Sequence, residues 1–270
     1  MNGVAGTLAG RAVLITGATG AGIASGICRA LADSGARLVV NGLTSDDVAA
    51  TVARHPGAVG AVGDVSRPDH VERVVEEATA QVGPLTGLVN NAGVGLRTPF
   101  DEVDEAQFDH VVGIDLRGVW LVSRAFARQC AGPPAAIVNV SSVHARSTIA
   151  GFGIYAGAKA GVEGFTRGCA VDLGPRGVRC NAIAPGYVPV DPALADRAHA
   201  AEWIDRHTRE EQPLHRLIEP IDCGWAVRFL LSEESRCITG QVLTVDAGLT
   251  ARLYNGETTA RTHADRAGRS

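Results

Sequence analysis

The segment Ala12-Val-Leu-Ile-Thr16 runs directly into Gly17-Ala-Thr-Gly20-Ala-Gly22-Ile23, and this junction decides the fold. Its first five residues form a mostly apolar run, which is typical of a strand that is buried on both faces. The glycines then allow the backbone to turn tightly, and a helical pattern begins near Gly22. A glycine-rich turn followed by a helix N-terminus exposes unpaired N–H groups that suit a pyrophosphate. The junction therefore predicts a strand–turn–helix unit that holds a dinucleotide.

Apolar runs and helical stretches alternate along the rest of the chain. The strand-like runs are Ala12–Thr16, Arg37–Asn41, Ala58–Gly63, Gly87–Asn90, Ala135–Val140, Val178–Ile183 and Val242–Val245. Helical patterns between them include Ile23–Ser34, Pro68–Val82, Glu105–Cys130 and Tyr155–Leu173. Alternating units of these lengths predict an α/β fold, a single doubly wound parallel sheet of about seven strands with helices on both faces. We assign this domain to residues 1–250.

Composition narrows the classes of partner. The 270 residues are 46% apolar and 20% charged, which is typical of a globular protein with a sizeable core. The net charge of −4 gives no reason to expect nucleic acid or an anionic membrane. The six cysteines are scattered without metal-ligand spacing, so they predict a reducing compartment and no metal site. Neither a signal-peptide core nor a spanning helix is evident, so we expect a cytoplasmic protein.

Two segments interrupt the alternation. Residues 191–213 lie between the last two predicted strands and read as a helical excursion with Trp203 in its middle. Ligands of open α/β sheets bind beyond the carboxyl ends of the strands, so we expect this segment to be a substrate lid. The polar tail, residues 251–270, is either a frayed terminus or an arm that lies on a neighbouring subunit.

The end of the second strand bears on the choice of cofactor. A carboxylate there would bind the ribose hydroxyls of NAD and repel the 2′-phosphate of NADP. The chain instead carries Asn41-Gly42-Leu43-Thr44-Ser45, with no acid and no arginine. Backbone N–H groups and the Thr44 and Ser45 hydroxyls remain to bind a phosphate. The segment favours NADP(H) over NAD(H).

Tyr155-Ala-Gly-Ala-Lys159 carries the chemical signal. On a helix, residues four apart share one face, so the phenol and the ammonium are placed together. A neighbouring cation favours the phenolate form, which makes a phenol useful in proton transfer. Alone, such a pair is more typical of an ordinary helix surface than of a catalytic site. However, Ser141 and Ser142 end a buried-type strand, and Ser142 stands thirteen residues before Tyr155.

Together these motifs resemble the short-chain dehydrogenase/reductase family over about residues 8–250. The glycine turn is similar to the family's TGxxxGxG, with one extra residue and Ala24 in place of the last glycine. Asn90-Asn91-Ala92-Gly93 resembles the NNAG motif, and Pro185-Gly186 resembles the PG motif. The resemblance implies that Ser142, Tyr155 and Lys159 are catalytic, with Tyr155 as the proton-transfer residue. Ser141 is then structural, because successive strand side chains face opposite ways.

The resemblance also implies the cofactor contacts. These are Gly17, Thr19, Gly20, Gly22, Ile23, Asn41, Gly42, Leu43, Asp64, Val65, Asn91, Ala92, Gly93, Tyr155, Lys159, Pro185, Gly186 and Val188. The substrate pocket is expected to include Val94, His144, Phe152, Tyr187 and Trp203. Assembly into a homotetramer, or a dimer, is implied through the Tyr155–Leu173 helix and the last helix and strand.

Two positions depart from the family pattern. Asp115 stands where relatives carry a catalytic asparagine, and Val190 replaces a frequent threonine. An ionised carboxylate cannot donate a hydrogen bond, so Asp115 puts any proton relay built on this position in question; its charge also makes a pair with Lys159 one option.

The resulting hypothesis is an NAD(P)-dependent oxidoreductase that interconverts a ketone and a secondary alcohol on a small-molecule substrate. One alternative is a 3-oxoacyl-thioester ketoreductase, which would need a basic patch for a carrier protein. The other is a nicotinamide-sensing regulator without catalysis, which usually lacks the tyrosine or lysine.

Overall fold

The computed structural model describes residues 6–130, 132, 134–189, 204 and 207–253. It confirms the predicted fold class, with seven parallel strands in the order β3-β2-β1-β4-β5-β6-β7. The strands are β1 (Ala12–Ile15), β2 (Arg37–Gly42), β3 (Val59–Val62), β4 (Gly87–Asn90), β5 (Ala135–Val140), β6 (Val178–Pro185) and β7 (Val242–Val245). The strand order reverses between β1 and β4, and open sheets of this kind bind ligands beyond the carboxyl ends of the strands at such a point.

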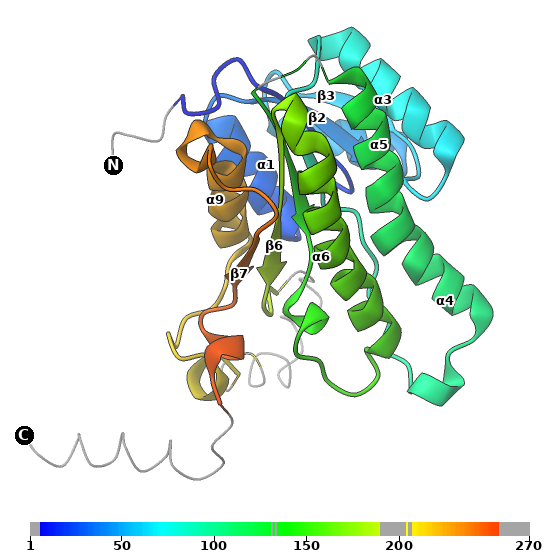
Figure 1. Ribbon diagram of the computed structural model, residues 1–270, viewed down its shortest axis with the longest axis vertical. Helices are drawn as coiled ribbons and strands as arrows, with labels where there is room; N and C mark the ends of the chain where they lie inside the picture. The colour runs from blue at the N-terminus through cyan, green and yellow to red at the C-terminus, as the bar shows by residue number, and fades with distance from the viewer. Residues whose placement is uncertain (1–5, 131, 133, 190–203, 205–206, 254–270) are drawn as a thin grey trace, which may run out of the picture.

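Helices cover both faces of the sheet. They are α1 (Ile23–Asp33), α2 (Ser45–Arg54), α3 (Pro68–Val82), α4 (Glu105–Val112), α5 (Val119–Gln129), α6 (Gly153–Leu173) and α9 (Pro220–Leu231). Figure 1 shows α1 and α9 together on one side of the sheet and α3 and α5 on the other. The two layers account for the apolar strand sequences, because alternate residues of one strand enter different cores. In β1, Val13 and Ile15 pack toward α1 and α9, whereas Leu14 packs toward α3 and α5.

The predicted helix Glu105–Cys130 is wrong as a single regular helix. It consists of α4, a π-helical turn at Gly113–Gly118 and α5. A π turn adds one residue to a helical turn and is frequent at functional sites. Here the extra residue lies where the Asp115 side chain enters the interior. The hydrophobic pattern of the whole stretch did not reveal the interruption.

Helix α2, which is ten residues long, was not among the predicted helices. Its start is fixed by Thr44, whose hydroxyl accepts a hydrogen bond from Asp47 N at 3.2 Å. For the expected lid, residues 190–203 and 205–206 lie outside the described part of the chain, as does Trp203. The described part contains a short π-helical turn at His207–Glu211.

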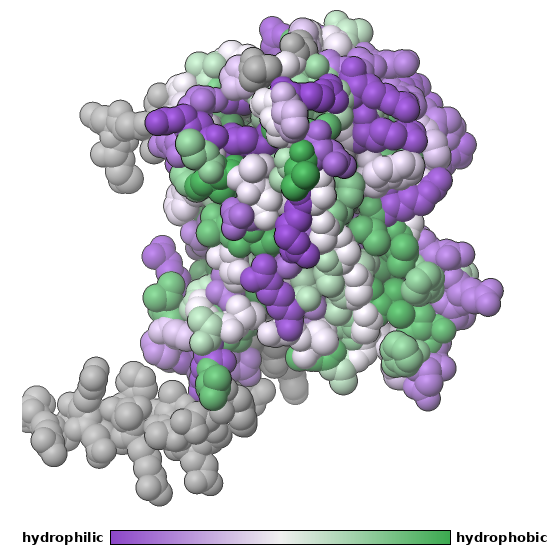
Figure 2. All heavy atoms as spheres, in the orientation of Figure 1, coloured by the Kyte–Doolittle hydropathy of each residue, from purple (hydrophilic) through white to green (hydrophobic). Residues whose placement is uncertain are grey.

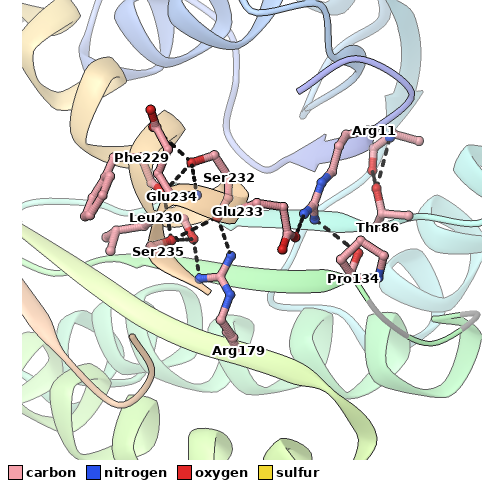
Figure 3. Close-up of polar contacts among 11 residues, drawn as sticks. Arg11, Thr86, Pro134, Arg179, Phe229, Leu230, Ser232, Glu233, Glu234 and Ser235 are labelled. Carbon is pink, nitrogen blue, oxygen red and sulfur yellow. Dashed lines mark hydrogen bonds and ion pairs between the residues drawn. The ribbon is translucent and has the colours of Figure 1, made fainter. Parts of the chain in front are cut away.

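Two arginines, the buried Arg11 and the half-buried Arg179, hold neighbouring segments at the amino ends of the strands (Figure 3). Arg179 donates to the carbonyls of Leu230 at 2.7 Å and Ser232 at 3.0 Å, so it satisfies the C-terminus of α9. Arg11 donates to Pro134 O and pairs with Glu233 at 2.8 Å. Burial lowers the pKa of both guanidinium groups. The amino ends of the strands therefore have a structural role, and the candidate site lies at their carboxyl ends.

Within the described ranges, no helix is long and apolar enough to cross a membrane. The same residues contain no group of three or more histidine, cysteine or acidic side chains arranged to hold a metal ion.

Candidate active site

The glycine turn after β1 has a backbone that only glycine fits. Gly17 has φ of +57°, and a Cβ there would lie 2.7 Å from Ala92 Cα. Gly20 has φ of +89°, with open space around its missing side chain. Gly22 is the N-cap of α1, and no side chain caps this helix. The bare helix N-terminus and open turn fit the phosphates of a dinucleotide.

Hydrogen bonds from neighbouring strands hold the turn. The Thr16 hydroxyl accepts from the backbone N–H groups of Asn91 and Ala92, each at 3.1 Å. The Asn91 side chain donates back to Thr16 O at 3.1 Å and Gly17 O at 3.0 Å. Asn41 donates its amide to Ala61 O and Gly63 O. The two asparagine side chains therefore bind protein atoms and give the turn its shape.

Lys159 and Asp115 form a buried ion pair. Lys159 Nζ lies 3.0 Å from Asp115 Oδ2, and the side chains are 5% and 0% exposed. Lys159 Nζ also donates to Val140 O at 3.0 Å, whereas Asp115 Oδ1 accepts from Val94 N at 2.8 Å. Oδ2 makes the ionic contact without a hydrogen bond among the described residues. The carboxylate therefore compensates the ammonium and also fixes the loop after β4.

The absence of a side chain at Gly93 makes room for this pair. A Cβ there would lie 3.0 Å from Asp115 Oδ2 and 3.2 Å from Lys159 Nζ. These distances are tighter than most Cβ contacts, so a side chain at this position would push the Asp115 and Lys159 side chains aside by a few tenths of an ångström.

Tyr155 lies in the first turn of α6, one turn before Lys159. Its ring centre is 5.6 Å from Lys159 Nζ. His144 packs edge-on against it with ring centres 5.7 Å apart, and Phe152 does so at 6.0 Å. His144 also stacks on Phe152 at 4.6 Å, and its Nδ1 lies 2.8 Å from Thr148 Oγ1. Burial lowers the pKa of His144, so its imidazole favours the neutral form. The phenol is thus bordered by a cation and an aromatic wall.

Ser142 enters the site from the end of β5. Its hydroxyl accepts a hydrogen bond from His144 N at 3.2 Å and caps the short turn Val143–Ala145. Ser141 has another environment, since its hydroxyl donates to Lys159 O at 3.2 Å. The two serines therefore make different contacts, and Ser142 lies in the same short segment as His144.

The comparisons with known proteins agree with this geometry. Residues 17–250 match a sequence family described as enoyl-(acyl carrier protein) reductase. The chain is 36% identical over 250 residues to L-xylulose reductase of Homo sapiens, covering 90% of this chain and 98% of that protein. It belongs to the short-chain dehydrogenase/reductase family. Members are NAD(P)-dependent oxidoreductases that act on CH–OH and C=O groups, and so is this chain.

Two solved structures show how closely the fold is shared. Gluconate 5-dehydrogenase from Burkholderia cenocepacia, in complex with NADP and tartrate, superimposes with a TM-score of 0.82 and 32% identity, covering 91% of this chain and 97% of that one. A short-chain dehydrogenase/reductase variant from Serratia marcescens has a TM-score of 0.82 and 25% identity, covering 90% and 99%. The likeness extends over nearly the whole of each chain.

In this dehydrogenase/reductase the end of β2 has an unexpected environment. The Thr44 hydroxyl donates to Asp47 Oδ2 at 2.6 Å, and the Ser45 hydroxyl lies 3.4 Å from Asp46 Oδ1. Leu43 is 71% exposed. The hydroxyls expected to meet a 2′-phosphate are therefore bonded to carboxylates in the first turn of α2.

The other sites expected for cofactor and substrate lie at the carboxyl ends of the strands. Asp64 Oδ1 accepts from the N–H and hydroxyl of Ser66 at 2.8 and 2.7 Å, which fixes its direction. Gly186 N donates to Val245 O at 2.9 Å, and Val188 is buried. Burial raises the pKa of Tyr187, so this phenol stays protonated.

Sequence reasoning missed three participants of the site. Thr16 organises the glycine turn through its hydroxyl; the resemblance to TGxxxGxG includes this threonine but assigned it no role. Arg146 and Glu163 form an ion pair at 3.0 Å beside the Ser142 segment. Since they are seventeen positions apart in the sequence, no local pattern connects them.

Proposed function

We propose that the chain is an NADP(H)-dependent enzyme that interconverts a ketone and a secondary alcohol, with Tyr155 as general acid and base. The observation that carries this proposal is the buried Lys159 ammonium beside the Tyr155 ring, at 5.6 Å from its centre. A cation at this position stabilises a phenolate, which a proton-transfer residue must become in each turnover. The family membership supports the same reaction class.

The residues divide the work of the reaction between them. When bound, the nicotinamide supplies or accepts the hydride. In the reductive direction, Tyr155 protonates the substrate oxygen, and the Ser142 hydroxyl donates a hydrogen bond to that oxygen. Lys159 then stabilises the phenolate. Asp115 holds the ammonium in place at 3.0 Å, so it acts on the phenol through Lys159.

The cofactor preference for NADP(H) rests on the absence of a carboxylate within β2 and at its last residues, Asn41 and Gly42. The related gluconate 5-dehydrogenase binds NADP. We infer that Leu43 and the following backbone N–H groups meet the 2′-phosphate, since the Thr44 and Ser45 hydroxyls are engaged elsewhere. Dissociation constants of NADPH and NADH measured by calorimetry decide the matter. Tighter binding of NADH would refute the preference.

The substrate is proposed to be a small, partly apolar carbonyl compound or alcohol. His144 and Phe152 form one wall of its pocket, and residues 191–213, with Trp203, form the lid. In this proposal residues 1–250 are the catalytic domain, residues 251–270 are a tail, and the protein is cytoplasmic.

Assembly into a homotetramer is proposed from the apolar surface over helices α4 and α5 (Figure 2). Phe108 is 45% exposed on α4, and Trp120 is 44% exposed on α5. Aromatic residues are enriched at subunit interfaces, and a contiguous exposed apolar patch is typical of an interaction surface.

The experiment is a panel of ketones, sugars, hydroxy acids and acetoacetyl-coenzyme A, assayed through the absorbance of reduced nicotinamide. With the best compound, Tyr155→Phe is expected to lose most of kcat and to keep the Kd for the cofactor. Turnover retained in this variant would remove Tyr155 from its role. Preference for the coenzyme A thioester would instead identify an acyl-thioester ketoreductase.

A further inference from the structure

Glu163 is a buried acid that the proposed mechanism does not use. It lies on α6, one turn beyond Lys159, and its side chain is 7% exposed. Its Oε2 pairs with Arg146 Nε at 3.0 Å, and Arg146 is 56% exposed. No described residue donates a hydrogen bond to the other oxygen, Oε1. Because the carboxylate is buried and has few other partners, loss of the ion pair would leave its charge uncompensated and destabilise the fold.

Arg146 ends the segment that carries the site serine, residues 142–146, here termed the serine loop. The loop is short and internally bonded, since Ala145 N donates to Ser142 O at 3.0 Å and His144 N donates to the Ser142 hydroxyl at 3.2 Å. Just before the loop, Ser141 donates to Lys159 O on α6 at 3.2 Å. The loop is therefore attached to α6 at both ends, by this hydrogen bond and by the ion pair.

We propose that Arg146 and Glu163 are positioning residues, whose ion pair holds the serine loop in register with helix α6. That helix carries Tyr155 and Lys159, so the distance from Ser142 to the phenol depends on where the loop sits. A hydroxyl that must meet the same substrate oxygen as the phenol tolerates little displacement. The kinetic part of this inference rests on the proposed function, whereas the structural part does not.

The first test measures the loop without turnover. Hydrogen–deuterium exchange, followed by mass spectrometry, is recorded for peptides that cover the serine loop in Arg146→Gln and Glu163→Gln. Loss of one anchor is expected to accelerate exchange there by about tenfold. The matched control is Glu233→Gln, which breaks the Arg11–Glu233 ion pair at the amino ends of the strands (Figure 3). Like the Arg146–Glu163 pair, it joins one buried and one exposed side chain. Glu233→Gln is expected to leave exchange in the loop unchanged.

The second test is a double-mutant cycle on kcat, with the best substrate of the panel. Arg146→Gln is expected to lower kcat by about tenfold to hundredfold, with the Kd for the cofactor unchanged. In a Ser142→Ala background the same substitution is expected to have little further effect, because the residue that it positions is gone. Arg146→Lys keeps the charge and is expected to restore part of the activity.

The double variant Arg146→Gln with Glu163→Gln separates positioning from stability. It leaves no uncompensated buried charge, so its Tm is expected to approach that of the wild type while kcat stays low. The inference is overturned if exchange in the serine loop does not change, if Glu233→Gln lowers kcat equally, or if the Arg146 and Ser142 effects are additive. If no carbonyl compound is turned over at all, the proposed function fails, and the exchange result still decides whether the ion pair holds the loop.

Discussion

Replacing Asp115 by asparagine tests the buried ion pair directly. Asp115 places Oδ1 on Val94 N at 2.8 Å and Oδ2 beside Lys159 Nζ at 3.0 Å. Asparagine has one acceptor oxygen, so its NH₂ group must face either the backbone N–H or the ammonium. Lys159 then keeps Val140 O as its described acceptor and loses its countercharge. We expect Asp115→Asn to lower the free energy of unfolding by about 2–4 kcal/mol, between the costs of an unsatisfied buried donor and a broken buried ion pair.

The assay is thermal unfolding at fixed protein concentration, since assembly makes Tm depend on concentration. A loss of this size is expected to lower Tm by roughly 5–10 °C. The control is Asp109→Asn, the same chemical change at an exposed position of α4, for which no measurable shift is expected. If Asp115→Asn unfolds at the wild-type temperature or above it, the cost of burying two charges outweighs their attraction, and the reasoning is refuted.

Three further predictions follow from packing and titration. A Cβ at Gly26 would lie 2.0 Å from the backbone of Pro220 in α9. Gly26→Ala is therefore expected to lower the free energy of unfolding by about 3 kcal/mol or more. Denaturant unfolding measures this, and a midpoint equal to that of the wild type would contradict it. Burial lowers the pKa of His144 in the folded protein below its ordinary value of 6.5. The unfolded chain therefore takes up the proton first on acidification, so this contribution to stability is fully present above pH 6.5 and is lost as the pH falls through the folded pKa. The Tm of His144→Gln should therefore fall less on acidification than that of the wild type, and parallel curves would refute the effect. Burial raises the pKa of Cys28 and Cys223 to about 12, whereas Cys237 is exposed. A thiol reagent at neutral pH should therefore label Cys237 in the native protein, and Cys28 and Cys223 only after unfolding. Rapid labelling of Cys223 in the native protein would contradict this and show that the core opens.

Local sequence patterns were sufficient to predict the strands of the sheet. Apolar runs of strand length and helical periodicities are properties of neighbouring residues, and these set all seven strands to within two residues at each end. The hydrophobic patterns missed two features whose stability depends on single side chains. Helix α2 is stabilised at its start by the Thr44 cap, and the π turn in the Glu105–Cys130 stretch accommodates a buried aspartate.

The site shows the same division. The sequence by itself determined that a glycine turn follows the first strand and that Tyr155 and Lys159 share one face of a helix, because both depend on spacings of a few residues. Only the tertiary structure decided that Asp115 reaches Lys159 at 3.0 Å and that Glu163 pairs with Arg146. These contacts join residues from different elements, and their distances depend on how the helices pack against the sheet. Whether a charge is compensated is therefore fixed by the packing of the whole molecule, and no short stretch of the chain contains that information.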